Sequence, residues 1–148
     1  MRKEFVMRGK TASGETEVLN FSGFKPGMAY RLTEFLLFPS TATGTTSYEM
    51  CGSITAGKTA MAPADQNFND EGLIATSLVA TSTSQPANEE LVVINDTYMI
   101  TQNLILMVQD VAGGSRPVNW QCRFESVKMN GSQEAATNYK QYLISDGS

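Results

Sequence analysis

The sequence predicts an all-β protein, a β-sandwich like a jelly roll with one short helix near its C-terminus. Short segments that alternate apolar and polar residues recur along most of the chain, and turn-forming Gly, Pro, Asn and Asp residues separate them. Charged residues make up 18% of the chain, below the roughly 25% of an average globular protein. The 148 residues contain no repeat and no linker, so we expect a single domain, 1–148.

The expected strands follow one another with short connections. They cover residues 4–8, 15–21, 29–38, 47–55, 72–81, 91–94, 98–101, 103–109 and 117–129. Segment 29–38 begins with alternation and becomes apolar on both faces, which predicts a strand in the middle of the domain. The pair Gly113-Gly114 predicts a hairpin between the last two strands.

The clearest strand is 117–129. Trp120, Cys122 and Phe124 share one face of it, because side chains alternate along a strand. We therefore expect Trp120 to lie in the core. Near the end of the strand the apolar positions shift by one residue, which predicts a β-bulge after Ser126.

The two ends of the chain have their own expected elements. Residues 132–143 predict a terminal helix, because Ser132 can cap it and Glu134 favours its first turn. The apolar residues that share one face of this helix are Ala135, Tyr139, Tyr142 and Leu143. Residues 1–14 have two interpretations, an N-terminal arm or an edge strand of the same domain.

The segment GSITAGKT, residues 52–59, matches the phosphate-binding loop pattern G-x-x-x-x-G-K-[ST] at every fixed position. In that motif backbone N–H groups surround the phosphates, Lys58 would reach the outer phosphates and Thr59 would bind Mg²⁺. The site also requires a helix directly after the loop, and Pro63 would break a helix there. We therefore reject nucleotide hydrolysis and interpret the segment as a strand that leads into a glycine turn.

Three further site hypotheses are weaker than their structural alternatives. Asp96 and Asp110 end apolar runs, as a magnesium-binding aspartate does, but both lie at turn signals. Loop 57–71 has oxygen ligands that suit Ca²⁺ but lacks the EF-hand spacing, and a solvated loop is the preferred interpretation. Its candidate ligands are Asp65, Asn67, Asn69, Asp70 and Glu71. An aromatic platform for sugars is the alternative to core positions for Trp120, Tyr30, Tyr48 and Tyr98.

The residue types exclude several classes of function. The chain has no histidine, so the usual general base and the commonest zinc ligand are missing. We expect a non-enzymatic protein with no catalytic residue, no metal, no cofactor and no small-molecule substrate. Cys51 and Cys122 are the only cysteines, and their apolar surroundings predict two buried thiols rather than a disulfide.

The charges and the apolar runs bear on partners and compartment. The net charge is −4, and the one basic cluster, Arg2, Lys3, Arg8 and Lys10, is too small for a nucleic-acid groove. The segment MRKEFVMRGK lacks the apolar stretch of a signal peptide, and no apolar run approaches the length of a membrane helix. We expect a protein made in the cytoplasm, without nucleic-acid or membrane partners.

The C-terminal third carries a resemblance to a known group of proteins. The stretch VNWQCRFESVKMNGSQEAATNYKQYL, preceded by TYMITQNLILMVQDVAGG, resembles the closing strands of small virion proteins encoded by tailed phages of aquatic bacteria. In composition the chain is also similar to phage capsid decoration proteins. The resemblance implies a virion protein that forms a symmetric oligomer and docks on a capsid or another virion surface. It implies no catalytic residue.

Assembly is accordingly the leading hypothesis, with copies of the same chain and a major capsid or other virion protein as partners. The apolar centre of the N-terminal segment, Phe5, Val6 and Met7, supplies the candidate assembly contacts, because an apolar strand can add to a neighbouring sheet. The alternative is a β-sandwich module that binds carbohydrate or a receptor through loops such as 40–47 and 57–71.

Overall fold

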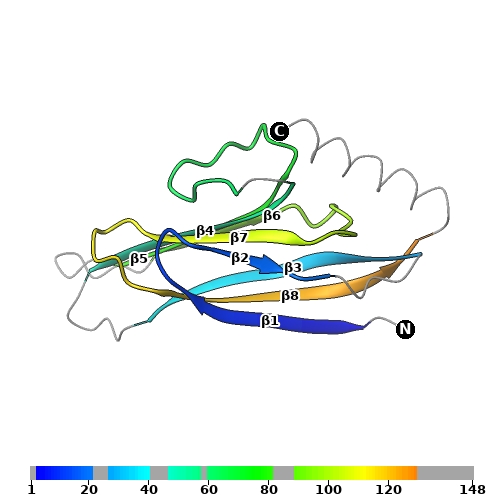
Figure 1. Ribbon diagram of the computed structural model, residues 1–148, viewed down its shortest axis with the longest axis horizontal. Helices are drawn as coiled ribbons and strands as arrows, with labels where there is room; N and C mark the ends of the chain where they lie inside the picture. Colours follow the sequence, from blue (N-terminus) through cyan, green and yellow to red (C-terminus); the bar gives the residue numbers. More distant parts are fainter. Residues whose placement is uncertain (1–2, 22–26, 41–46, 58–59, 82–88, 130–148) are drawn as a thin grey trace.

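The computed structural model describes residues 3–21, 27–40, 47–57, 60–81 and 89–129. All regular structure in these ranges is β-strand (Figure 1). The strands are β1 (Glu4–Thr11), β2 (Thr16–Leu19), β3 (Met28–Pro39), β4 (Tyr48–Ala56), β5 (Leu73–Thr81), β6 (Glu89–Ile94), β7 (Leu104–Asp110) and β8 (Val118–Lys128). Their positions confirm the predicted all-β class.

The strands form two antiparallel sheets that pack as a sandwich. The three-stranded sheet has the order β1-β8-β3, and the five-stranded sheet has the order β2-β7-β4-β5-β6. A jelly roll pairs the first strand with the last, the second with the seventh, the third with the sixth and the fourth with the fifth. The chain shows three of these pairings, whereas β6 pairs with β5 instead of β3.

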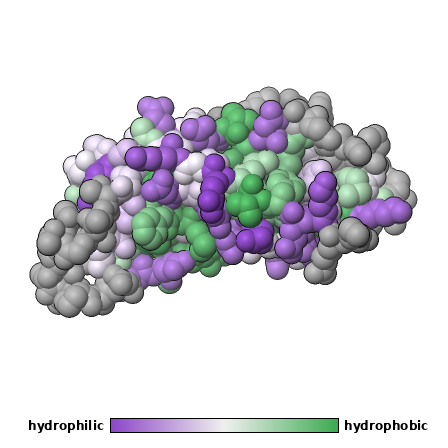
Figure 2. All heavy atoms as spheres, turned by 90° about the horizontal axis from the view of Figure 1, so that it is seen from below, coloured by the Kyte–Doolittle hydropathy of each residue, from purple (hydrophilic) through white to green (hydrophobic). Residues whose placement is uncertain are grey.

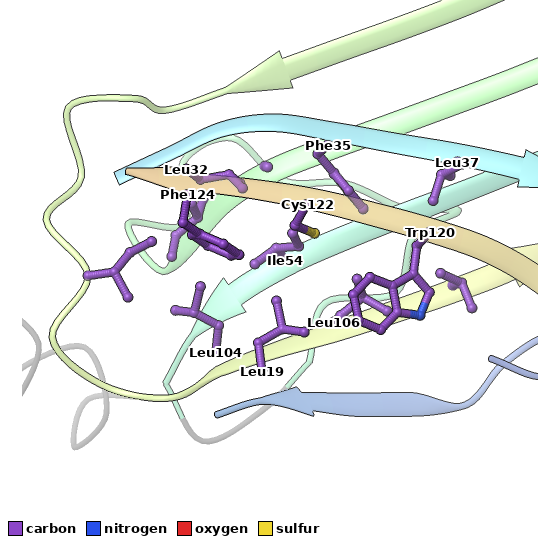
Figure 3. Close-up of a cluster of buried hydrophobic side chains, with 14 of the residues drawn as sticks. Leu19, Leu32, Phe35, Leu37, Ile54, Leu104, Leu106, Trp120, Cys122 and Phe124 are labelled. Atoms are coloured by element: carbon purple, nitrogen blue, oxygen red, sulfur yellow. The ribbon is translucent and has the colours of Figure 1, made fainter. Parts of the chain in front are cut away.

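One hydrophobic core lies between the two sheets (Figure 3). Both sheets contribute large side chains that are almost fully buried: Leu19, Leu32, Phe35, Ile54, Leu104, Leu106, Cys122 and Phe124. The face predicted for the last strand is confirmed, because Trp120 is only 8% exposed and shares the inner face of β8 with Cys122 and Phe124. Burial on this scale is the main favourable contribution to folding.

Trp120 is held by specific contacts with β1. Its indole N–H donates a hydrogen bond to the hydroxyl of Thr11 over 2.9 Å. Its ring also covers Gly9, the residue opposite it in the register, where a Cβ would come within 2.8 Å of the ring. The indole therefore occupies space that only a glycine at position 9 leaves free.

Segment 29–38 lies at an edge of a sheet, so the prediction of a central strand is wrong. β3 pairs along its length with β8 alone. Its other backbone pairing in the described residues is a single β-bridge between Tyr30 and Ile100. Its inner residues enter the core, but Leu36 and Phe38 on its outer face are 38% and 69% exposed. The two-sided apolar pattern of this segment therefore corresponds to one face of β3 in the core and one exposed apolar face.

The predicted bulge occurs in the same strand pair but on the other strand. The register shifts at Thr33 of β3, whose hydroxyl donates to the carbonyl of Arg123 over 3.2 Å. β8 runs without a break through Ser126, so the position predicted from the sequence is wrong. Glu125 of the same strand is buried and accepts a hydrogen bond from Arg31 over 3.2 Å.

Two connections also differ from expectation. Residues 98–101 form no strand and contribute only the bridge at Ile100. Gly113-Gly114 does not close a hairpin, because β7 and β8 lie in different sheets and the turn crosses between them. Gly113 has φ +92°, a backbone conformation that favours glycine. The predicted helix, 132–143, lies outside the described residues. No helix in the described ranges has the length and apolar character needed to cross a membrane.

Candidate interaction surfaces

The segment that matches the phosphate-binding pattern begins inside β4. Gly52 to Thr55 pair with both β5 and β7, and Ala56 pairs with β7, so their backbone groups take part in the sheet and do not surround a ligand. A Cβ at Gly52 would lie 2.9 Å from the ring of Phe35. Gly57 ends the strand with φ +130°, and the following described residues, 60–72, contain no helix. The expected strand and glycine turn are present. Lys58 and Thr59 lie outside the described residues.

Asp110 anchors the turn between β7 and β8. Its buried carboxylate accepts hydrogen bonds from the backbone N–H groups of Ala112 and Arg116 and from Nε of Arg116, the last over 2.9 Å. Burial alone would raise the pKa of Asp110, but these hydrogen bonds and the charge of Arg116 hold it below its usual value. Arg116 also donates to the carbonyl of Ser47 over 3.0 Å. The contacts of Asp110 are those of a structural residue.

The acidic and amide side chains of loop 57–71 make local turns. Asn67 accepts from the backbone N–H of Asn69 over 3.0 Å, and Asp70 accepts from the N–H of Gly72 over 2.8 Å. Such contacts are typical of Asx turns. No group of three or more acidic, cysteine or histidine residues within the described part of the chain is arranged to hold a metal ion.

The two cysteines are separate and buried, as expected. Burial raises the pKa of the Cys51 thiol to about 11, and the nearby charge of Glu49 adds to the effect. Burial also raises the pKa of Cys122, which lies in the core. Both thiols are therefore protonated near neutral pH, and a thiol in this form is a poor nucleophile.

The N-terminal segment is an edge strand of the three-stranded sheet. β1 pairs with β8 from Glu4 to Thr11. Phe5 and Met7 pack against the core, and Phe5 stacks on Phe124 at a centroid distance of 5.4 Å. Val6 lies on the outer face and is 38% exposed. Of the three candidate assembly contacts, only Val6 is available on the outer surface of the folded domain, and an assembly role for the segment stays a prediction.

A groove with a volume of about 690 Å³ lies on the outer face of the three-stranded sheet. Its floor consists of Asn119 and Gln121 of β8, with Leu36 and Phe38 of β3 beside them. Seen from the side of β1, the surface of the molecule has hydrophobic patches between hydrophilic side chains (Figure 2). Exposed apolar side chains gathered beside a groove often mark an interaction site, so this groove is a candidate binding surface.

Leu36 and Phe38 form an apolar strip along β3, and charged residues lie on both sides of this strip. Arg8 and Lys10 come from β1, and the register places them opposite Gln121 and Asn119. The Arg8 guanidinium donates to Oε1 of Gln121 through Nε, over 3.1 Å, and through Nη2. On the other side, Glu90 of β6 lines the same groove. The groove therefore has a basic side, an apolar middle and an acidic side.

The rest of the same outer face has its charges paired. Arg123 lies 4.0 Å from carboxylate oxygens of both Glu4 and Glu34, and Arg31 pairs with Glu125. No ion pair within the described ranges involves Arg8, Lys10 or Glu90. The charges around the groove thus differ from their neighbours in having no ion pair, and Arg8 is held by its hydrogen bonds to Gln121.

A second apolar surface lies on the outer face of the five-stranded sheet. It has a volume of about 620 Å³, and loop 57–71 forms part of its wall through Pro63 and Phe68. Leu91 and Val93 of the edge strand β6 contribute exposed side chains, 61% and 50% exposed, and Phe68 is 64% exposed. Cys51 lies at its base.

The sequence pointed to only one part of these surfaces, loop 57–71 at the wall of the second one. Alternation marked the inner faces of the strands, but no local pattern indicated that the outer faces of β3 and β6 remain uncovered. The aromatic platform for sugars does not form on the surface, because Trp120 and Tyr98 are buried. For the groove, the usable signal was the two-sided apolar pattern of segment 29–38, which predicts a central strand.

No protein-family model matches this chain, and no curated protein matches it either.

Proposed function

We propose that this chain is a non-enzymatic virion structural protein, a capsid decoration or minor capsid component that self-associates and docks on a virion surface. The observation that carries the proposal is the pair of apolar surfaces on the outer faces of the two sheets. One contains Leu36 and Phe38, and the other contains Leu91 and Val93. A protein that connects its own copies to a larger particle needs two such surfaces on different sides.

The fold and the chemistry support the same class. Sandwiches with jelly-roll pairing occur in viral capsid domains, and also in lectins and cupins. Fold alone does not choose among these functions. The buried side chains with perturbed pKa values, Asp110, Cys51, Cys122 and Tyr98, do not converge on either apolar surface as a catalytic set would. The resemblance of residues 118–143 to closing strands of phage virion proteins favours the capsid assignment.

Co-sedimentation tests the docking step. The protein is incubated with purified tailed-phage particles or empty capsids from aquatic bacterial hosts and separated on a density gradient. We expect saturable binding that the double variant Leu91→Ser/Val93→Ser weakens. Val18→Ser is the matched control, because Val18 is 62% exposed but lies on β2, outside both surfaces. Absence of the wild-type protein from the particle fractions of every host tried would contradict the proposal.

One observation favours the alternative, a carbohydrate-binding module. The groove on the three-stranded sheet combines the exposed ring of Phe38 with the amides of Asn119 and Gln121 and the guanidinium of Arg8. Aromatic faces with a few convergent polar groups are typical of ligand sites. Calorimetric titration with oligosaccharides distinguishes the two functions. Only the alternative predicts oligosaccharide binding that Phe38→Ser removes, with no effect of the same substitution on co-sedimentation with particles.

A further inference from the structure

We infer that the groove on the three-stranded sheet is a twofold interface, in which each copy places its basic side, Arg8 and Lys10, against the acidic side, Glu90, of a second copy. The inference rests on the self-association part of the proposed function and names its surface and its geometry. The partner is identified from the order of charges and apolar residues across the groove.

The first step is the order of residues on the surface. The sheet order β1-β8-β3 places the basic residues of β1 two strands away from the apolar residues of β3. Neighbouring strands are about 4.8 Å apart, so the backbones of these two groups are separated by roughly 10 Å. Glu90 lies on β6, which packs beside β3, and it lines the groove beyond the apolar strip. Across the strands, the groove is basic, then polar and apolar, then acidic.

The second step is the symmetry that this order favours. A twofold axis parallel to the strands, passing over Leu36 and Phe38, turns the groove of one copy onto that of another. Under this operation the apolar strip faces its own equivalent, and the basic side faces the acidic side in two equivalent places. A twofold axis across the strands would instead place Arg8 and Lys10 against the same residues of the partner. Isologous interfaces require such self-complementarity, and only the first axis provides it.

The third step is the energetics of the contact. Phe38 is 69% exposed beside a groove large enough to receive an aromatic ring. In the dimer the two Phe38 side chains would pack at the axis against the Leu36 and Phe38 of the opposite copy, as aromatic anchors do at the centre of interfaces. Arg8, Lys10 and Glu90 have no ion-pair partner in the described ranges, so they can pair across the interface without breaking an internal ion pair, although Arg8 also donates hydrogen bonds to Gln121 of its own chain. At the rim such pairs contribute mainly orientation and specificity.

Sedimentation velocity over a concentration series tests the interface. We expect a monomer–dimer equilibrium for the wild-type protein and a dimer weakened about tenfold or more by Phe38→Ser. This change removes an exposed side chain, so it leaves the fold intact, which circular dichroism checks. Phe68→Ser is the matched control, because Phe68 is 64% exposed in loop 57–71, beside the other sheet and outside the groove. A wild-type monomer at all concentrations, or a dimer disrupted by Phe68→Ser and not by Phe38→Ser, would overturn the inference.

Charge reversal tests the twofold geometry. Lys10→Glu and Glu90→Lys should each weaken the dimer by about two- to fivefold at low salt. When the two single variants are mixed, position 10 of each copy again faces an opposite charge at position 90 of the other copy. A heterodimer should therefore form with wild-type affinity. An effect within one chain cannot be rescued by mixing. If the mixture dimerises no better than the separate variants, the proposed axis is wrong.

The two proposals can fail separately. A wild-type monomer that still co-sediments with particles would refute the interface and self-association, but not docking on the virion. A dimer that shows the Phe38 and charge-reversal effects but binds no particle would refute only the virion assignment.

Discussion

Gly52→Ala is expected to destabilise the native protein by about 1–3 kcal/mol, the usual cost of overpacking a core. A Cβ at this position would lie 2.9 Å from Cζ of Phe35 and 3.3 and 3.4 Å from the two methyl carbons of Leu37. The closest contact is roughly 0.6 Å shorter than the shortest favourable carbon–carbon separation of about 3.5 Å. Phe35 is fully buried and Leu37 nearly so, so neither side chain has free space to move into.

Equilibrium urea unfolding measures this change as a shift of the midpoint at constant slope. Phe35→Leu removes the ring atom that would clash, so combining it with Gly52→Ala should cost less than the sum of the two single changes. If Gly52 instead served a phosphate site, Gly52→Ala would leave stability unchanged and abolish nucleotide binding. An unchanged midpoint, or strict additivity of the two substitutions, would refute the packing argument. Lys58→Ala is expected to leave both fold and function unchanged.

Four further outcomes follow from the structure. Trp120→Ala should cost about 3–5 kcal/mol in unfolding free energy, and iodide should not quench the native fluorescence of Trp120 freely, because the ring is 8% exposed. Ionised Asp110 should contribute to the free energy of unfolding at pH values above its unfolded pKa of 3.8, and this contribution should disappear as the pH falls through its lower native pKa. Asp110→Asn should remove this part of the acid dependence of unfolding. Cys51 and Cys122 should resist a thiol reagent in the native protein at pH values well below the raised pKa of about 11 of Cys51, and both should react after unfolding; rapid modification of either native thiol would contradict their burial. Deletion of residues 1–10 should unfold the domain, because β1 pairs with β8 and covers the core; a folded, monomeric product by circular dichroism and light scattering would support the separate arm instead.

Local patterns were sufficient for much of the fold. The period-two alternation of β8 correctly placed Trp120 in the core, because the face of a strand depends only on sequence parity. Pro63 was enough to argue against a phosphate loop, since proline disrupts a helix whatever surrounds it. Both inferences depend on backbone geometry within a few residues, and such geometry is encoded locally.

Errors arose where the outcome depended on partners distant in the chain. Both faces of segment 29–38 are apolar, which predicts a central strand. An apolar pattern in the sequence does not determine whether another layer of the structure covers that face. Gly113-Gly114 looked like a hairpin, whereas the glycines allow a turn that packs around Asp110 and Arg116 and joins two different sheets. The bulge was placed after Ser126 instead of at Thr33, because its position is set by the pairing of both strands.

The sequence by itself determined the all-β class, the approximate position of each strand in the described ranges and the inner face of β8. These depend on side-chain periodicity and on the conformational limits of proline and glycine. Only the tertiary structure decided which strands lie at sheet edges and which apolar side chains remain exposed. It also brought Arg8, Leu36, Phe38 and Glu90 together around one groove. These residues come from three strands far apart in the chain, and their proximity results from the pairing of β1 with β8 and the packing of β6 beside β3, which no local pattern specifies.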